Sequence, residues 1–157
     1  MKLQIEWGRP IRLRDATSEN MIYGIDLDRV ASSAGVYIFG RLWGSQFEAL
    51  YVGKAGNNIR GRVKTHLNNL RLMQHLRNAK SGNRLVLAGR LITRRGQRFE
   101  KSLALAERAL IRHFLSEGHD LVNQQGVHLR RHELESSGKY PKRFFPNIIF
   151  LEKTKGE

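Results

Sequence analysis

The stretch GVYIFGRLWGSQFEALYVGKAGNNIRGRVKTH, residues 35–66, carries the strongest structural signal in this chain. It contains two short runs of apolar and β-branched residues, 35–39 and 49–53, joined by a glycine-containing connection. Two such runs on either side of a turn predict a β-hairpin. Tyr37 lies in the first run and Tyr51 in the second, so the hairpin brings two phenol side chains into one small unit.

A helix is predicted directly after the hairpin, over residues 58–82. Asn58 is a favourable N-cap, and apolar residues then recur at helical spacing: Ile59, Val63, Leu67 and Leu70. Arg62 and His66 are four residues apart beside this stripe, so they share one side of the helix at the border of the core. Lys54 precedes the turn into the helix. A lysine, an arginine and a histidine are therefore expected near the two phenols.

A third strand and a second helix follow. Residues 84–93 are largely apolar and predict the strand, and residues 99–117 predict the helix, which stops at Gly118. Leu103 lies four residues before Glu107 and Leu110 lies three after it, which places this carboxylate on the buried face of the helix. An unpaired carboxylate there is costly. Two explanations stay open: an ion pair with one of the many arginines, or a bound metal ion.

These residues resemble the GIY-YIG nuclease family. Gly35-Val36-Tyr37 and Tyr51-Val52-Gly53 correspond to its two half-motifs. The later positions match in the same order: Arg62, His66, Glu107 and Asn123. The resemblance covers residues 34–123, with Ala34 in place of a common proline and His66 in place of a common tyrosine. Neither departure removes a group that the chemistry needs.

The resemblance implies an α/β (α+β) fold with a small three-stranded, mostly antiparallel sheet flanked by helices. It also implies an endonuclease that hydrolyses phosphodiester bonds in DNA, with one divalent ion, Mg²⁺ or Mn²⁺, held by Glu107. A single carboxylate suits Mg²⁺, which keeps several waters in its coordination shell. Residues 34–123 are expected to form the nuclease core of a single domain, with accessory extensions at residues 1–33 and 124–157.

Roles for the two tyrosines follow from the same resemblance. Tyr51, together with Tyr37, would act as the general base or orient the attacking water. A phenol with a pKa of about 10 is a poor base at neutral pH, so Lys54 and Arg62 are expected to favour the phenolate. Which tyrosine is the base stays open. The structural alternative is that both tyrosines fill the core and hydrogen-bond at its edge.

The other matched residues would bind or position. Arg62 would clamp the phosphate with its planar fork of donors. His66 would orient a tyrosine or carry a proton, and Asn123 would pin the elements of the site by side-chain hydrogen bonds. The alternative for Arg62 and His66 is a solvated helix face.

Charge indicates the partner. The chain carries a formal charge of +14, and residues 49–99 contain twelve basic residues and no aspartate or glutamate. This distribution favours a polyanion, against the alternative of a solvated basic face kept for solubility. The expected nucleic-acid contacts are Arg60, Lys64, Arg71, Arg90, Arg94 and Arg95. RNA would fit such a surface as well as DNA, because phosphate contacts carry no sequence information.

A non-catalytic nucleic-acid-binding module on the same fold remains a rival function, and a protein partner or a homodimer stays open. The chain has no cysteine, no signal-peptide pattern and no apolar run of the roughly 20 residues that a membrane helix needs. A soluble cytoplasmic protein is therefore expected.

The terminal segments give weaker patterns. Alternating apolar residues within residues 2–14 predict a small accessory hairpin. Near the C terminus a short helix is predicted over residues 127–134, and a strand over 147–152 that pairs beside this hairpin. The remaining histidines show no metal-ligand spacing and are interpreted as surface or nucleic-acid contacts: His75, His113, His119, His128 and His132.

Overall fold

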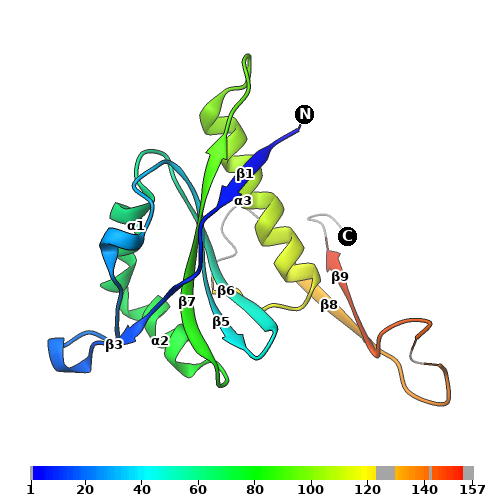
Figure 1. Ribbon diagram of the computed structural model, residues 1–157. Helices are drawn as coiled ribbons and strands as arrows, with labels where there is room; N and C mark the ends of the chain where they lie inside the picture. The colour runs from blue at the N-terminus through cyan, green and yellow to red at the C-terminus, as the bar shows by residue number, and fades with distance from the viewer. Residues whose placement is uncertain (1, 123–129, 142, 154–157) are drawn as a thin grey trace.

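A central antiparallel sheet lies between two layers of helices (Figure 1). The computed structural model describes residues 2–122, 130–141 and 143–153. The three expected strands are β5 (Gly35–Trp43), β6 (Gln46–Ala55) and β7 (Asn83–Ile92). One face is covered by α1 (Ile59–Leu67) and α2 (Leu70–Asn78), and the other by α3 (Phe99–Ser116). The expected mixed class of helices on an antiparallel sheet is confirmed.

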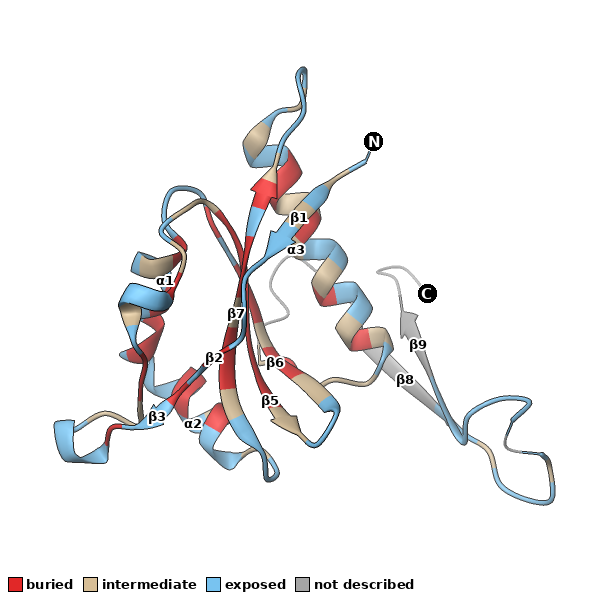
Figure 2. Ribbon diagram, in the orientation of Figure 1, coloured by how far each residue is buried: buried red, intermediate tan, exposed pale blue. Residues whose placement is uncertain are grey.

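The hairpin of β5 and β6 is the centre of the core, as predicted, although both strands are longer than their motifs. Tyr37 lies opposite Gly53 and Phe39 lies opposite Tyr51. Because side chains alternate along a strand, Tyr37 and Phe39 pack toward α1 and α2, whereas Ile38 packs toward α3. Buried residues accordingly follow the middle of the sheet and the inner faces of the helices (Figure 2).

The main sheet has five strands, so the prediction of three was wrong. The two additional strands come from the N-terminal segment, β1 (Gln4–Trp7) and β2 (Ile11–Arg12), and both pair with β7. The predicted N-terminal hairpin was therefore also wrong. Between the two strands, the Gly8 amide still donates to the Ala88 carbonyl at 3.0 Å. Pro10 has no amide hydrogen for the ladder, so the segment follows β7 as one interrupted strand.

The single helix predicted over residues 58–82 is two helices. Asn58 caps α1 by accepting a hydrogen bond from the Gly61 amide at 3.3 Å. Asn69 caps α2 in the same way, from the Leu72 amide at 3.2 Å. An asparagine that caps a new helix offers the backbone an alternative to continuing the old one. The chain therefore turns at residues 68–69, and α2 packs beside α1 on the same face.

The C-terminal segment forms a separate two-stranded sheet, β8 (Arg130–Glu135) and β9 (Ile148–Lys153). The helix predicted over residues 127–134 was wrong for its described part, and β9 pairs with β8 rather than beside the N-terminal segment. This ribbon projects away from the main sheet (Figure 1), and β9 contacts α3.

The segment between β2 and β5 contains four short elements: β3 (Arg14–Asp15), η1 (Thr17–Glu19), β4 (Tyr23–Gly24) and η2 (Leu27–Arg29). β3 and β4 pair with each other. Among the helices in the described ranges, none is long and apolar enough to cross a membrane.

Candidate active site

The predicted site residues gather around the outer edge of β6, the last strand in the order β1-β7-β5-β6. Tyr51 and Lys54 are three positions apart on β6, so their side chains emerge on opposite faces of the sheet. Tyr51 packs with His66 of α1, and Lys54 pairs with Glu107 of α3. The site therefore wraps around the edge of the sheet and draws on both helical layers.

On the α1 side, a buried tyrosine–histidine pair forms the base of the site. The Tyr37 hydroxyl and Nε2 of His66 share a hydrogen bond of 2.7 Å. Tyr51 lies over this pair, with ring centroids 4.8 Å from His66 and 6.2 Å from Tyr37. Gly53 makes room for the Tyr37 ring, because a Cβ at that position would collide with it. The Tyr37 ring therefore requires a glycine at position 53.

Burial keeps the rings of Tyr37, Tyr51 and His66 uncharged. It raises the pKa of both Tyr37 and Tyr51 above the usual value, although Arg62 lowers each pKa in part. It also lowers the pKa of His66 to about 4, with a smaller contribution from Arg62. The expectation that neighbouring cations favour a phenolate is therefore not met in the chain alone, because desolvation of the charged form outweighs their attraction.

Arg62 is exposed on α1 and acts electrostatically on all three rings. It lies at the border between the core and solvent, as its place beside the apolar stripe predicted. A guanidinium in that position is accessible to an anion that approaches the two tyrosines. Its planar set of donors matches a phosphate.

On the α3 side, the site is charged. Nζ of Lys54 lies 3.2 Å from Oε2 of Glu107, and 21% of the Glu107 side chain is exposed. Of the two explanations left open, the ion pair is present, but its cation is a lysine rather than an arginine. The charge of Glu107 also raises the pKa of Tyr51, so the carboxylate acts on the α1 side as well.

A single divalent ion at this site would have the carboxylate of Glu107 as its protein ligand. No group of three or more metal-ligating side chains occurs within the described part of the chain, and one carboxylate with waters is a mode of binding typical of Mg²⁺. Lys54 already places a cationic group against Oε2. A metal ion at this carboxylate would therefore replace or share the lysine's position.

Asn123 lies outside the described residues. The chain just before it is held against β6, because the Val122 amide donates to the Leu50 carbonyl at 2.9 Å. His119 contributes to the same attachment, since its Nδ1 accepts a hydrogen bond from the Ala49 amide at 2.7 Å. The interpretation of His119 as a surface or nucleic-acid contact was wrong. Its partner is seventy positions away in sequence, and no spacing pattern links the two.

His75 belongs to this attachment too. Its Nε2 hydrogen-bonds the Asp120 carbonyl oxygen at 2.8 Å, which links α2 to the segment that precedes Asn123. Both histidines therefore hold the segment that leads to a predicted site residue.

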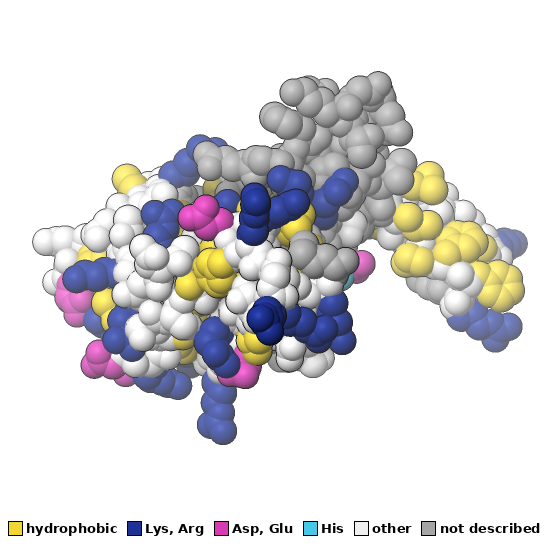
Figure 3. Space-filling view, turned by 90° about the horizontal axis from the view of Figure 1, so that it is seen from above, with side chains coloured by type: hydrophobic (Ala, Val, Ile, Leu, Met, Phe, Trp, Pro, Cys, Tyr) yellow, Lys and Arg dark blue, Asp and Glu magenta, His cyan; other side chains and the backbone are white. Residues whose placement is uncertain are grey.

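The expected nucleic-acid contacts fall into two groups. Arg60 donates to the carbonyls of Val30 and Asp28, and Arg90 forms an exposed ion pair with Glu6 at 3.4 Å. The remaining four are exposed: Lys64, Arg71, Arg94 and Arg95. Lysine and arginine side chains are spread over the face shown in Figure 3, with only a few acidic groups among them. Part of the basic surface is thus structural, and part is available to a partner.

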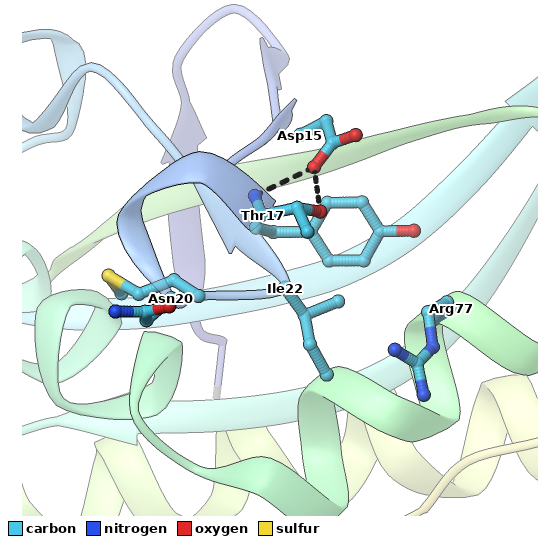
Figure 4. A pocket seen from close by; sticks show the side chains of 7 residues that line it. Asp15, Thr17, Asn20, Ile22 and Arg77 are labelled. Carbon is cyan, nitrogen blue, oxygen red and sulfur yellow. Dashed lines mark hydrogen bonds between the residues drawn. The ribbon is translucent and has the colours of Figure 1, made fainter.

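A pocket lies apart from this cluster, against η1 and α2 (Figure 4). Asp15 contributes a carboxylate to it, but that carboxylate accepts hydrogen bonds from the amide and the hydroxyl of Thr17, which lower its pKa. Arg77 of α2 also lines the pocket. The Asp15 contacts hold the local turn together, so we place the candidate active site at the β6 edge.

Comparison of the chain with protein-family models, with curated proteins and with solved structures found no match. The interpretation of the site rests on the geometry and chemistry of its side chains.

Proposed function

We propose that this chain is a divalent-metal-dependent endonuclease, similar to the GIY-YIG nucleases, that hydrolyses phosphodiester bonds in DNA. One observation carries the proposal: two phenols, an imidazole, a guanidinium, an ammonium and a carboxylate surround one edge of one strand. Phosphodiester hydrolysis needs an oriented water, positive charge at the phosphate and help for the leaving oxygen. The cluster offers groups for each of these tasks. The exposed basic residues support a polyanionic substrate.

Tyr51 is the better placed of the two phenols to act on a water. Tyr37 is fully buried and hydrogen-bonded to His66, whereas Tyr51 is only partly buried. In this assignment Tyr37 and His66 position Tyr51, and its hydroxyl orients the water. Because both phenols are neutral in the chain alone, proton removal depends on added positive charge, which a divalent ion held at Glu107 would supply.

Arg62 would bind the phosphate and offset its negative charge, and Lys54 would do the same once its ion pair with Glu107 opens. Glu107 would hold Mg²⁺ or Mn²⁺. The bound ion would stabilise charge on the phosphate and lower the pKa of groups beside it. The carboxylate lies on the opposite side of the sheet edge from Arg62, so a phosphate between them would be held from two sides.

A non-catalytic nucleic-acid-binding module is the second candidate. The Lys54–Glu107 ion pair favours it, because the carboxylate already has a cationic partner at 3.2 Å and has no need of a metal ion. The raised pKa values of both phenols also favour it, because a neutral phenol is a poor base. A nuclease directed to RNA is a third candidate, supported by the basic surface alone.

A panel of labelled substrates separates the three candidates. Duplex DNA, single-stranded DNA and structured RNA are incubated with the protein, once with Mg²⁺ and once with EDTA. Cleavage of DNA that needs Mg²⁺ supports the proposal, and cleavage of RNA alone transfers it to the third candidate. Binding of DNA without cleavage in Mg²⁺ or Mn²⁺ would show that the chain is a binding module.

A further inference from the structure

A second cationic cluster lies toward the opposite edge of the sheet, where β1 meets β7. A pocket of about 450 Å³ is lined there by Arg9, Arg29 and Arg90, together with Glu6 and Ser33. We call this the arginine pocket. Arg9 and Arg29 were not among the residues that the sequence singled out, because the acid-free stretch that drew attention begins at residue 49.

The arginine pocket lies on the same face of the sheet as the tyrosines. Ala88 lines it and is directly opposite Tyr37 in the ladder between β7 and β5, and opposite residues point to the same face. From β6 to β1 the order is three strand intervals. At ~4.8 Å each, this separates the β1 side of the pocket from Tyr51 by about 14 Å across the strands. The pocket also lies farther along them, because Tyr51 is in register with Val86 whereas Ala88 and Arg90 line the pocket.

The charges in the pocket are not balanced by the fold. Within residues 2–122, 130–141 and 143–153, the side chains of Arg9 and Arg29 have no hydrogen-bond or ion-pair partner, and both are exposed. Arg90 forms an ion pair with the carboxylate of Glu6. Three cations therefore face one anion. Arg60 differs from Arg9 and Arg29 because its guanidinium donates hydrogen bonds to backbone carbonyls.

The start of α1 borders the pocket but does not supply it with free donors. The Ile59 amide donates to the Ser33 carbonyl, and the Arg60 amide donates to the Ala31 carbonyl. The next amide, that of Gly61, is capped by Asn58. An anion in the pocket would therefore be bound by the arginine side chains and not by the helix terminus.

We propose that the arginine pocket binds a backbone phosphate of the nucleic-acid substrate, at a distance from the phosphate that Arg62 contacts. This inference rests on the proposed function, because it takes the nucleic acid to lie across the α1 face. Since the separation across the strands alone is about 14 Å, the span corresponds to at least about four base steps of 3.4 Å each along the duplex axis. The pocket thus sets how far a substrate must extend beyond the reacting phosphate.

The main test is a double variant, Arg9→Ala with Arg29→Ala. Its matched control removes the same charge from exposed positions on α3, on the other face of the sheet: Lys101→Ala with Arg108→Ala. Affinity for a 14-base-pair duplex is measured by fluorescence anisotropy in EDTA at several salt concentrations. Because all four side chains are exposed, thermal unfolding of both variants should match that of the unmodified protein.

We expect the pocket variant to bind about tenfold or more weakly and to lose about one unit of salt slope, at roughly 0.9 for the one phosphate that the pocket contacts. The control should change affinity by less than about threefold, as for a diffuse effect of charge. A further variant should have the opposite effect. Among the residues that the structure describes, Glu6 is the one carboxylate lining the arginine pocket, so Glu6→Gln should tighten binding, whereas Glu117→Gln on the far side should not. Equal effects in the pocket variant and its control, or no tightening with Glu6→Gln, would overturn the inference.

The two proposals fail separately. Cleavage of DNA that is indifferent to Arg9 and Arg29 overturns the arginine pocket and leaves the nuclease standing. Binding that depends on the pocket without any cleavage retains the pocket and overturns the nuclease. Absence of nucleic-acid binding by the unmodified protein overturns both.

Discussion

The two sides of the β6 edge differ in burial and in charge, although their residues are neighbours. On the α1 side, Tyr37 and His66 are buried, hydrogen-bonded and uncharged at neutral pH. On the α3 side, Lys54 and Glu107 are partly exposed and form an ion pair at 3.2 Å. The hydrogen-bonded rings are inside the fold, and the ion pair is near its surface.

For the proposed nuclease, this difference determines where additional positive charge would have to come from. Burial holds the phenols neutral even with Arg62 nearby, so the α1 side would orient a water without removing its proton at neutral pH. The additional positive charge would come from the α3 side, where Glu107 would hold the metal ion. Substitutions on each side of the edge test this division of tasks.

Arg62 is the charged residue of α1 that acts on all three rings, and its substitution should have the largest effect. Arg62→Lys keeps the charge and loses the planar fork of donors. We expect turnover to fall by about a hundredfold, as when one transition-state donor is removed, with little change in affinity. Steady-state kinetics should show normal turnover for Arg71→Lys, which changes an exposed arginine on α2. Equal turnover of Arg62→Lys and the unmodified protein would contradict the clamp.

Burial of His66 predicts a pH dependence of stability. Its pKa of about 4 in the folded state lies below the value of about 6.5 for an unfolded chain. As the pH falls from 6.5 toward 4, the unfolded state therefore takes up the proton first, and the free energy of unfolding decreases. The contribution of His66 to this loss is on the order of 2 kcal/mol.

Urea unfolding at pH 7 and at pH 4.5 measures this contribution as a difference between proteins, which removes the effect of other titrating groups. His66→Gln should lose less stability on acidification than the unmodified protein. His113→Gln, which changes an exposed histidine on α3, should behave like the unmodified protein. The same acid sensitivity in all three proteins would show that His66 is not held uncharged by burial.

Substitution of the two tyrosines should affect stability and turnover differently. Tyr37→Phe leaves Nε2 of His66 without its partner at a buried site, so it should lower the free energy of unfolding by about 1–2 kcal/mol. Tyr51→Phe should change stability by less and reduce turnover at saturating substrate by more than Tyr37→Phe does. Denaturant unfolding and single-turnover kinetics on the two variants provide the comparison. A larger loss of turnover in Tyr37→Phe would make the buried tyrosine the one that acts on the water.

Substitution of Lys54 on the α3 side should have the smallest effect. It should strengthen binding of the metal ion, whereas the substitutions above reduce turnover or stability. Lys54→Gln removes the cation that competes for Glu107, so Mn²⁺ should bind more tightly, by about two- to fivefold, the range for a partly exposed ion pair. Lys64→Gln, which removes an exposed charge from α1, should leave the affinity unchanged. Calorimetric titration with Mn²⁺ makes the measurement. Weaker binding in Lys54→Gln would mean that the ion does not take the lysine's position.

Local patterns in the sequence predicted the centre of this molecule well. The β5–β6 hairpin, the Asn58 cap and the position of Arg62 beside the apolar stripe depend on residues within one turn or one hairpin of each other. The Asn68-Asn69 pair at which α1 ends is also a local signal, but apolar residues keep their helical spacing through it, and the spacing alone predicts one helix. Whether a helix ends at such a cap or continues through it depends on packing against the rest of the fold. Helical periodicity in the sequence does not contain that information.

Long-range pairing could not be predicted in the same way. β1 pairs with residues 89–92, more than eighty positions away, and an alternating pattern does not specify which strand it joins. His119 and Ala49 are separated by a similar distance in sequence. The direction of the tyrosine pKa shifts was missed because it depends on burial from several elements at once. The sequence indicated which side chains lie near the β6 edge. The balance between desolvation and charge that sets the pKa of each tyrosine depends on the positions of these side chains in the fold.

Cleavage of DNA by purified protein is the decisive measurement. The unmodified protein and Glu107→Gln are purified in parallel and incubated with supercoiled plasmid DNA in Mg²⁺, with an EDTA sample for each. Parallel handling controls for a contaminating nuclease, and DNA binding by Glu107→Gln controls for folding. We expect nicked and linear DNA only for the unmodified protein in Mg²⁺, with binding by the variant retained or tighter. Equal cleavage by both proteins, or cleavage by neither, would contradict the proposed nuclease.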